Sequence, residues 1–233
     1  MNWLTDPAHW TGADGVPQRL FEHLGYTAVS LLIAVVIGFP LGALVGHTGR
    51  GGLVVVGLTN GLRALPSLAV VILLVLFAGL GDAPVIAALV LLAVPPIMAG
   101  TYAGIRAVDP VTVDAARGVG MRERNVLFGV EIPNAMPLVL GGFRSATLQV
   151  IATATIAAFV GSGGLGRYVF DGLALQEYDQ MLAGAVLVAL LAVVVDLLLV
   201  GLQRLIVSPG LRSAGTTGRR RKAVAALETG GKQ

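Results

Sequence analysis

Residues 114–120, Asp-Ala-Ala-Arg-Gly-Val-Gly, interrupt an otherwise apolar chain, and Pro133 follows them after twelve further residues. Hydrophobic residues make up 55% of the 233-residue chain and charged residues 12%, about half the charged fraction of a typical soluble domain. In so apolar a chain, a short polar segment with glycine and proline at defined positions indicates a docking place for a soluble partner. The sequence therefore predicts an all-α polytopic membrane protein.

The composition excludes several classes of function. The chain has no cysteine, which excludes disulfide scaffolds, thiolate metal sites and thiol nucleophiles. A sequence pI of about 9.7 would suit a nucleic-acid binder, but the basic residues flank apolar stretches, where the positive-inside rule explains them better. Residues 1–14 contain no Lys or Arg, so they lack the basic region of a secretory signal, and the first apolar stretch is expected to be retained.

The apolar stretches predict five membrane spans, because crossing a hydrocarbon core of ~30 Å takes about 20 apolar residues. The predicted spans are residues 24–46, 53–80, 85–106, 137–160 and 181–206. The second stretch is too long for one straight span, and Asn60, Arg63 and Pro66 are expected to divide it into two segments. This gives a permease domain over 24–207, preceded by an external arm over 1–23.

The distribution of Lys and Arg predicts the orientation. With the N-terminus outside, Arg19 and Arg167 lie on the outer side and Arg63 and Arg144 lie within spans, while the remainder of the 16 Lys and Arg residues lie on the inner side. The C-terminus and the loop over 107–133 are then cytoplasmic. The Gly-, Ser- and Arg-rich tail over 208–233 is expected to be disordered, and to bind acidic membrane lipid rather than nucleic acid.

The polar loop has the pattern of two short helices joined by a sharp turn. Asp109 can cap a helix over 110–117. Gly120 allows the turn, because glycine accepts a positive φ without a Cβ clash. A second helix is expected over 121–131, ended by Pro133.

Asp114, Ala115, Ala116, Gly120 and Pro133 resemble the "EAA" loop of ABC importer permeases, with Asp in place of the Glu. In that family the loop is a pair of short helices that enter a groove on the ATPase subunit. The resemblance implies that these five residues couple the chain to an ATPase, with the two small alanines lying close against the partner.

The resemblance continues through residues 141–144 (GGFR), 157–159 (AAF) and 161–166 (GSGGLG), and is closest to the osmoprotectant permease subfamily. It implies a type I importer permease in the bacterial cell membrane, forming half of a pore for glycine betaine, choline, carnitine or proline. The implied partners are a second permease copy or paralogue, cytoplasmic ATPases and an extracytoplasmic binding protein. ATP binds the ATPases, so the chain itself is expected to carry no cofactor.

Gly161, Gly163, Gly164 and Gly166 satisfy the G-x-G-x-x-G pattern, but a dinucleotide site needs a strand before it and a helix after it. This segment follows a predicted membrane helix, and no Lys-Ser/Thr pair makes it a phosphate-binding loop. Two interpretations stay open. The segment is a flexible outer turn, or, as the resemblance implies, a loop near the pore mouth and the docked binding protein.

No catalytic or metal-binding constellation is found, so the chain is not expected to be an enzyme. His9, His23 and His47 all lie near the N-terminus, and no His-Glu-x-x-His motif occurs.

Three ionisable residues fall within or near the spans: Arg63, Arg144 and Asp196. At a rise of about 1.5 Å per residue in a straight helix, both arginines are expected near the inner interface, whereas Asp196 lies deeper. A carboxylate at that depth needs a partner or water. The two interpretations are an ion pair with Arg144 or Arg63, and a position lining the pore.

Two other functions remain as alternatives. A methionine-type amino-acid importer has the same architecture and shares the loop and the Gly-rich segment. An ion-driven secondary transporter would be expected to contain an inverted repeat, and the sequence shows no convincing one.

Overall fold

The computed structural model describes residues 3–207, which are helical throughout apart from short connections. The long helices are α1 (Val16–Thr48), α4 (Asp82–Arg106), α7 (Ile132–Ala154) and α9 (Tyr178–Ile206). The shorter α-helices are α2 (Gly52–Ala64), α3 (Ser67–Ala78), α5 (Pro110–Gly118), α6 (Glu123–Val126) and α8 (Gly166–Leu175). The 3-10 helices are η1 (Trp3–Thr5), η2 (Pro7–Trp10) and η4 (Thr155–Val160), and η3 (Leu127–Glu131) is a π-helix. The predicted tail over 208–233 lies outside the described residues.

The helices confirm an all-α membrane protein with four to five candidate spans. Four helical segments are long and apolar enough to cross a membrane, and α2 with α3 forms a fifth candidate that is bent by 89°. The predicted division of residues 53–80 is confirmed at Pro66, which lies between these two helices, whereas Asn60 and Arg63 lie inside α2. Proline cannot donate a backbone hydrogen bond, so the helix stops before it and starts again after it.

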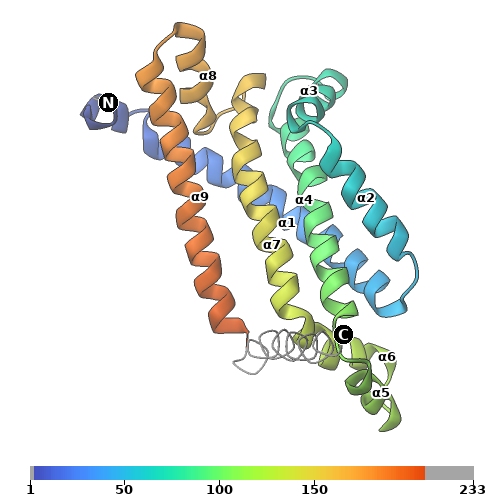
Figure 1. Ribbon diagram of the computed structural model, residues 1–233. Coiled ribbons are helices and arrows are strands. Elements are labelled where there is room, and N and C mark those ends of the chain that lie inside the picture. The colour runs from blue at the N-terminus through green and yellow to red at the C-terminus, as the bar shows by residue number, and fades with distance from the viewer. Residues whose placement is uncertain (1–2, 208–233) are drawn as a thin grey trace, which may run out of the picture.

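Helix α4 forms the centre of the bundle, with α1 packed on one side and α7 on the other (Figure 1). Glycines allow both close approaches. A Cβ built on Gly42 of α1 would lie 2.5 Å from the Met98 carbonyl oxygen of α4, and one on Gly100 of α4 would lie 2.7 Å from the Cα of Gly142 of α7. Any larger residue would separate these helices, so the three-helix core depends on the glycines.

The bundle has two distinct ends, which we name by the short helices that they carry (Figure 1). At the α8 end, the Tyr26 hydroxyl of α1 donates to Asp82 at the start of α4, at 2.9 Å. At the α5 end, helices α5 and α6 extend beyond the long helices, and His47 near the end of α1 contacts Glu131. Residues far apart in sequence therefore meet at each end of the bundle.

The structure differs from the prediction at Pro133, which does not end the second helix of the loop. The helical segment runs from Glu123 to Val160, and Pro133 lies in the first turn of α7. The π-helix just before it explains this, because Ile132 donates to the carbonyl of Leu127, five residues back. In this wider turn the backbone N–H groups bond to carbonyls five residues back instead of four. With this change of register the helix continues through Pro133, which has no N–H to donate.

Two further differences concern helix boundaries. Helix α1 begins at Val16, before the expected start at residue 24, because Gly15 occupies the N-cap position and Pro17 the first turn. Helix α8 has no counterpart among the predicted segments. It forms a hairpin with α9 around Gln176, which has a left-handed backbone conformation with φ of 59°.

Candidate functional site

The loop at the α5 end is an elbow of two helices, α5 and α6. Its predicted start is confirmed: the Asp109 carboxylate accepts a hydrogen bond from the Val111 N–H at 3.0 Å. Gly120 has a φ of +84°, and the N–H of Met121 donates to the Ala116 carbonyl at 3.2 Å, which closes the turn after α5. The turn therefore depends on a backbone conformation that favours glycine.

The elbow has its own small hydrophobic core, which buries one residue of the Asp-Ala-Ala motif and leaves the other two exposed. Ala116 is buried with Val113 and Val126, whereas Asp114 and Ala115 are exposed. Both alanines were expected to lie against a partner, but the small size of Ala116 serves the packing of α5 on the segment after the turn. Only Asp114 and Ala115 of the motif are available to another protein.

The elbow also exposes three large apolar side chains, which the sequence analysis did not single out. Val111 is 73% exposed, Val119 82% and Phe128 60%. Val111 lies on α5, Val119 in the turn after it and Phe128 in η3, so exposed apolar groups occur along the whole loop. The sequence signal was present, since all three are apolar residues in the polar loop.

A chain of polar contacts between ionisable side chains connects the elbow to α1. Arg117 donates two hydrogen bonds of 3.0 Å to Glu123, and Glu123 lies 3.3 Å from Nε2 of His47. Nδ1 of His47 lies 2.5 Å from the carboxylate of Glu131, which is only 5% exposed. The hydrogen bonds to Glu123 raise the pKa of Arg117 above its ordinary value, so Arg117 stays cationic.

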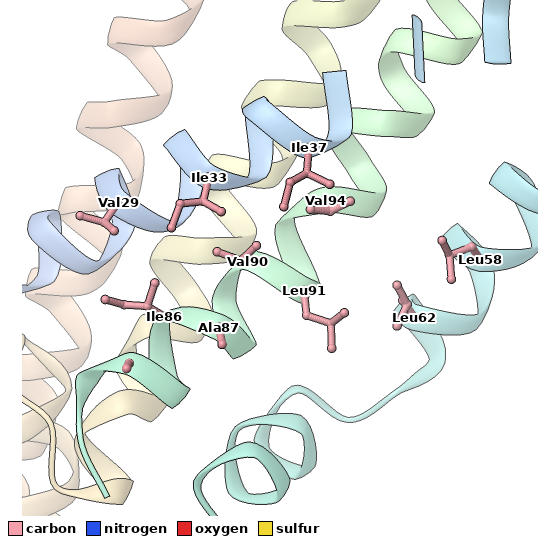
Figure 2. A pocket seen from close by; sticks show the side chains of 11 residues that line it. Val29, Ile33, Ile37, Leu58, Leu62, Ile86, Ala87, Val90, Leu91 and Val94 are labelled. Carbon is pink, nitrogen blue, oxygen red and sulfur yellow. The ribbon is translucent and has the colours of Figure 1, made fainter. Parts of the chain in front are cut away.

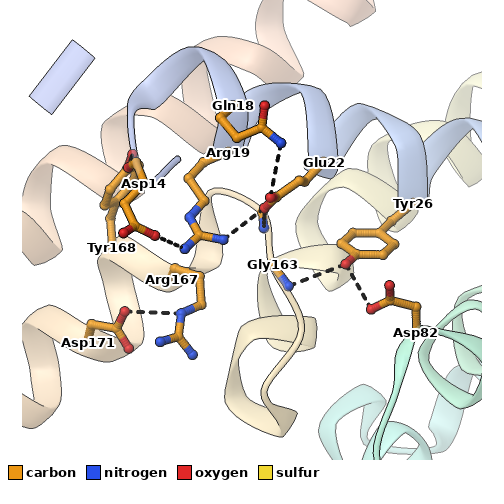
Figure 3. Close-up of polar contacts among 11 residues, drawn as sticks. Asp14, Gln18, Arg19, Glu22, Tyr26, Asp82, Gly163, Arg167, Tyr168 and Asp171 are labelled. Atoms are coloured by element: carbon orange, nitrogen blue, oxygen red, sulfur yellow. Dashed lines mark hydrogen bonds and ion pairs between the residues drawn. The ribbon is translucent and has the colours of Figure 1, made fainter. Parts of the chain in front are cut away.

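At the α8 end, side chains of α1 hold the Gly-rich loop over 161–166 (Figure 3). The Glu22 carboxylate accepts from the N–H of Gly164 at 2.8 Å, and the Tyr26 hydroxyl accepts from the N–H of Gly163 at 3.3 Å. Arg19 donates to Glu22 at 2.9 Å. Because its backbone is hydrogen-bonded to α1, the segment is a fixed loop, and the geometry does not favour a flexible turn.

Two of the predicted glycines lie in close contact: a side chain on Gly166 would meet the backbone of Thr155, and one on Gly163 would displace the Glu22 carboxylate that holds the loop. Gly161 and Gly164 instead have positive φ values, of +88° and +92°. All four glycines are therefore explained by the packing of this loop.

The N-terminal residues are attached to the same end. The Tyr168 hydroxyl of α8 donates to the Asp14 carbonyl oxygen at 2.5 Å, and Arg19 also pairs with the Asp14 carboxylate. Burial raises the pKa of Tyr168 to about 12, so the phenol remains a neutral donor. Arg167 pairs with Asp171 within α8 at 3.1 Å.

Asp196 of α9 pairs with Arg144 of α7, which is one of the two partners predicted for it. The guanidinium donates two hydrogen bonds to the carboxylate, and the one from Nη2 is 2.7 Å long. Below this ion pair, Gln203 of α9 donates to the Pro137 carbonyl at 3.3 Å. These contacts attach α9 to the rest of the bundle through polar groups.

Arg63 does not lie where the straight-helix estimate placed it. It lines a cavity with Leu92 of α4 and Gln149 of α7, residues well inside their helices. The 89° bend between α2 and α3 explains the error, because the distance estimate assumed one straight helix. Arg63 therefore lies at mid-bundle.

The same cavity contains polar side chains that the sequence analysis missed: Ser145, Gln149 and Thr153 of α7. Their spacing of four residues places them on one face of the helix. This spacing of polar residues within an apolar span was the signal that could have found them.

A second groove is of a different kind. It has a volume of about 750 Å³ and lies between α1, α4 and the end of α2. Figure 2 shows Ile33 and Ile37 of α1 facing Val90 and Val94 of α4 across it. Every side chain that lines this groove is aliphatic, so it offers no hydrogen-bonding group to a polar solute.

The bundle, the protruding elbow and the polar face of α7 together define a membrane component of a transport system. Residues 34–209 match the family described as binding-protein-dependent transport system inner membrane component, and the chain belongs to this family.

Relatives with assigned substrates cover most of the chain. It is 34% identical to the choline transport system permease protein OpuBB of Bacillus subtilis, over 83% of this chain and 89% of that protein. It is 35% identical to the glycine betaine/carnitine/choline permease OpuCB of B. subtilis, over 82% and 88%. With the osmoprotectant import permease OsmY of Salmonella typhimurium the identity is 36%, over 76% of both chains.

A solved structure has the same fold. A chain of the MetNI methionine ABC transporter in an inward-facing conformation superposes with a TM-score of 0.76, over 87% of this chain and 99% of that chain. The sequence identity is 20%, so this similarity shows the fold alone.

Membership of the family establishes the general role. The chain is a multi-pass component of the inner membrane, has no catalytic activity and carries no cofactor. It works in a binding-protein-dependent ABC transporter, and therefore together with an ATPase and a substrate-binding protein. This excludes the ion-driven secondary transporter.

Proposed function

We propose that this chain forms half of the membrane pathway of an importer for compatible solutes such as glycine betaine, choline, carnitine or proline. The observation that carries the proposal is its identity of 34–36% to osmoprotectant permeases over most of both chains. The methionine alternative has support only from the fold, at 20% identity. The polar face of α7 suits one side of a pathway, and a second copy or a paralogue supplies the other side.

We propose that the α5 end faces the cytoplasm. Arg50, Arg106, Arg122 and Arg124 lie at this end, and basic residues are retained on the cytoplasmic side. The α8 end has fewer basic residues in the described range, Arg19 and Arg167, which pair with Asp14 and Asp171. The N-terminal arm and the Gly-rich loop are then external, near the pore mouth and the docked binding protein.

The elbow is the proposed contact with the ATPase. Asp114 and Ala115 are exposed on α5, and Val119 and Phe128 add apolar surface. Gly120 fixes the turn between the two helices, and Pro133 lies where the second helix enters the membrane segment. The elbow continues without a break into α7, so a movement of the elbow is a movement of this helix.

Coupling then follows from two conformations with different affinities for the partners. ATP binding closes the ATPase dimer, the elbow moves as a unit, and the pathway opens to the other side. A ligand shifts such an equilibrium only by its differential affinity for the two states. The contacts of His47 with Glu131 and Glu123 transmit the movement to α1 as well as to α7.

The substrate is tested by uptake into proteoliposomes that contain the assembled transporter with its ATPase and binding protein. We expect ATP-dependent uptake of at least one labelled solute among glycine betaine, choline, carnitine and proline, and none of methionine. Uptake of methionine without any of the four solutes would overturn the proposal.

The elbow is tested by a matched pair of substitutions to tryptophan. Ala115 and Ala174 are both small and exposed, but Ala115 lies on α5 and Ala174 on α8. We expect Ala115→Trp to prevent co-purification of the ATPase and to abolish uptake at normal membrane levels, whereas Ala174→Trp retains the ATPase. If the Ala115→Trp variant still binds the ATPase with unchanged affinity, the elbow is not the contact.

A further inference from the structure

A polar cavity of about 470 Å³ lies between α2, α3, α4 and α7, at mid-bundle. Its volume is within the ~300–1,000 Å³ range of small-molecule sites. The residues that decide its chemistry are Arg63, Ser67, Ser145, Gln149 and Thr153. They come from the bent α2–α3 pair on one side and from α7 on the other, whereas the apolar groove of Figure 2 has no such group.

The polar side chains of this cavity differ from three threonines of the spans, whose hydroxyls are bonded within their own helices. The hydroxyls of Thr27, Thr101 and Thr147 each donate to the carbonyl four residues back, at 2.8–2.9 Å. Across residues 3–207, the Thr153 hydroxyl has no such bond, although Thr153 is only 6% exposed. Thr153 lines the cavity, and its hydroxyl is not one of the buried side-chain atoms left without a partner, so it is open to a molecule in the cavity.

Arg63 is in the same situation and carries a charge. It forms no hydrogen bond or ion pair with any residue of 3–207, in contrast to Arg144, which is paired with Asp196. Arg63 is exposed at the cavity wall, so water or an anion can reach a cation that would be costly at membrane depth without one. Ser145 and Gln149, which face the cavity with Arg63, are likewise without hydrogen-bond partners within the described range.

We propose that this cavity is a membrane-embedded binding site for the carboxylate of the transported solute. The Arg63 guanidinium binds the carboxylate with charge-assisted hydrogen bonds, and Gln149 donates to it from the middle of the polar face of α7, with Ser145 and Thr153 one turn to either side. The proposal rests on the proposed function and deepens it. It implies that the permease itself favours solutes with a carboxylate, such as glycine betaine, over choline, which has none.

The cavity is tested first by its charge preference, which does not depend on which solute is transported. The chain has no cysteine, so Ser145→Cys in the assembled transporter is a single reporter. We expect it to react at least fivefold faster with an anionic sulfonatoethyl methanethiosulfonate than with the cationic trimethylammonioethyl reagent, relative to Val119→Cys on the elbow. Adding Arg63→Gln should remove this preference, and Arg63→Lys should keep it.

Protection and uptake test the carboxylate itself. Glycine betaine should slow the reaction of Ser145→Cys, and choline at the same concentration should not. Arg63→Gln should reduce uptake of glycine betaine at least tenfold relative to the unaltered transporter. An unreactive Ser145→Cys, a charge preference that survives Arg63→Gln, or equal protection by both solutes overturns the site. No uptake of any osmoprotectant by the unaltered transporter overturns the proposed function instead.

Discussion

At the scale of single residues, Gly120 is constrained by its backbone alone. Its φ is +84°, and a Cβ at this position would meet no atom within 4 Å. Asn accepts a left-handed conformation, whereas a β-branched residue does so at a cost of about 1–2 kcal/mol. We therefore expect Gly120→Val to weaken ATPase co-purification and Gly120→Asn to preserve it, at equal membrane levels. Equal binding by both variants would show that the turn is not strained.

The buried carboxylate of Glu131 leads to a second residue-scale prediction. His47→Gln removes the imidazole that contacts Glu131, a side chain that is 5% exposed. Leaving a buried polar group without its partner costs about 1–3 kcal/mol, so the melting temperature of the purified complex should fall. Replacing both residues, His47→Gln with Glu131→Gln, should recover most of the loss. If His47→Gln melts like the unaltered protein, the pair contributes nothing to the attachment of the elbow.

The sequence could identify residues whose contacts lie within a few positions along the chain, but not residues whose partners are far away in sequence. Asp109 and Gly120 act through the backbone within a few residues, and both were predicted. The contact of His47 with Glu131 joins residues 84 positions apart, so no local pattern could reveal it. Ala116 was assigned to a partner surface because its size alone does not say which face of α5 it occupies.

At the scale of helices, apolar length predicted the spans well, since burial in lipid needs little more than length and composition. The π-turn before Pro133 and the hairpin of α8 with α9 were missed, because both depend on backbone geometry that composition does not encode. The depth of Arg63 was wrong for a related reason: a bend of 89° has no signature in a rise-per-residue estimate.

The attachment of α9 to α7 is the element-scale prediction. Asp196→Leu leaves Arg144 without its partner, and Arg144→Leu leaves Asp196 without its own. Each single change should lower the amount of folded protein in the membrane, because an uncompensated charge remains between the helices. The double change should recover part of this amount.

Gln203→Leu is the matched control for these variants, because it removes the neutral contact with Pro137 between the same helices and leaves no charge. We expect it to have the smaller effect. If Asp196→Leu is present at normal levels but transport is lost, the carboxylate acts in the pathway and not in assembly.

At the scale of the whole molecule, each end of the bundle is assembled from segments that are distant in the chain. At the α8 end, the Tyr26 hydroxyl contacts both Asp82 and the Gly-rich loop. At the α5 end, the His47 imidazole contacts both Glu123 and Glu131. The polar cavity lies between the two, where α2 and α3 bend. Alternating access requires the two ends to open in turn, and each end has its own set of contacts to break.

The orientation of these two ends is a prediction that labelling can decide. Asp14 and Leu80 lie at the α8 end and Arg50 and Val119 at the α5 end, all on exposed positions. In this cysteine-free chain, a membrane-impermeant thiol reagent should label Asp14→Cys and Leu80→Cys in intact cells. Arg50→Cys and Val119→Cys should react only after permeabilisation. Labelling of Val119→Cys from outside would place the elbow on the side without ATP, and the proposed ATPase contact would then be wrong.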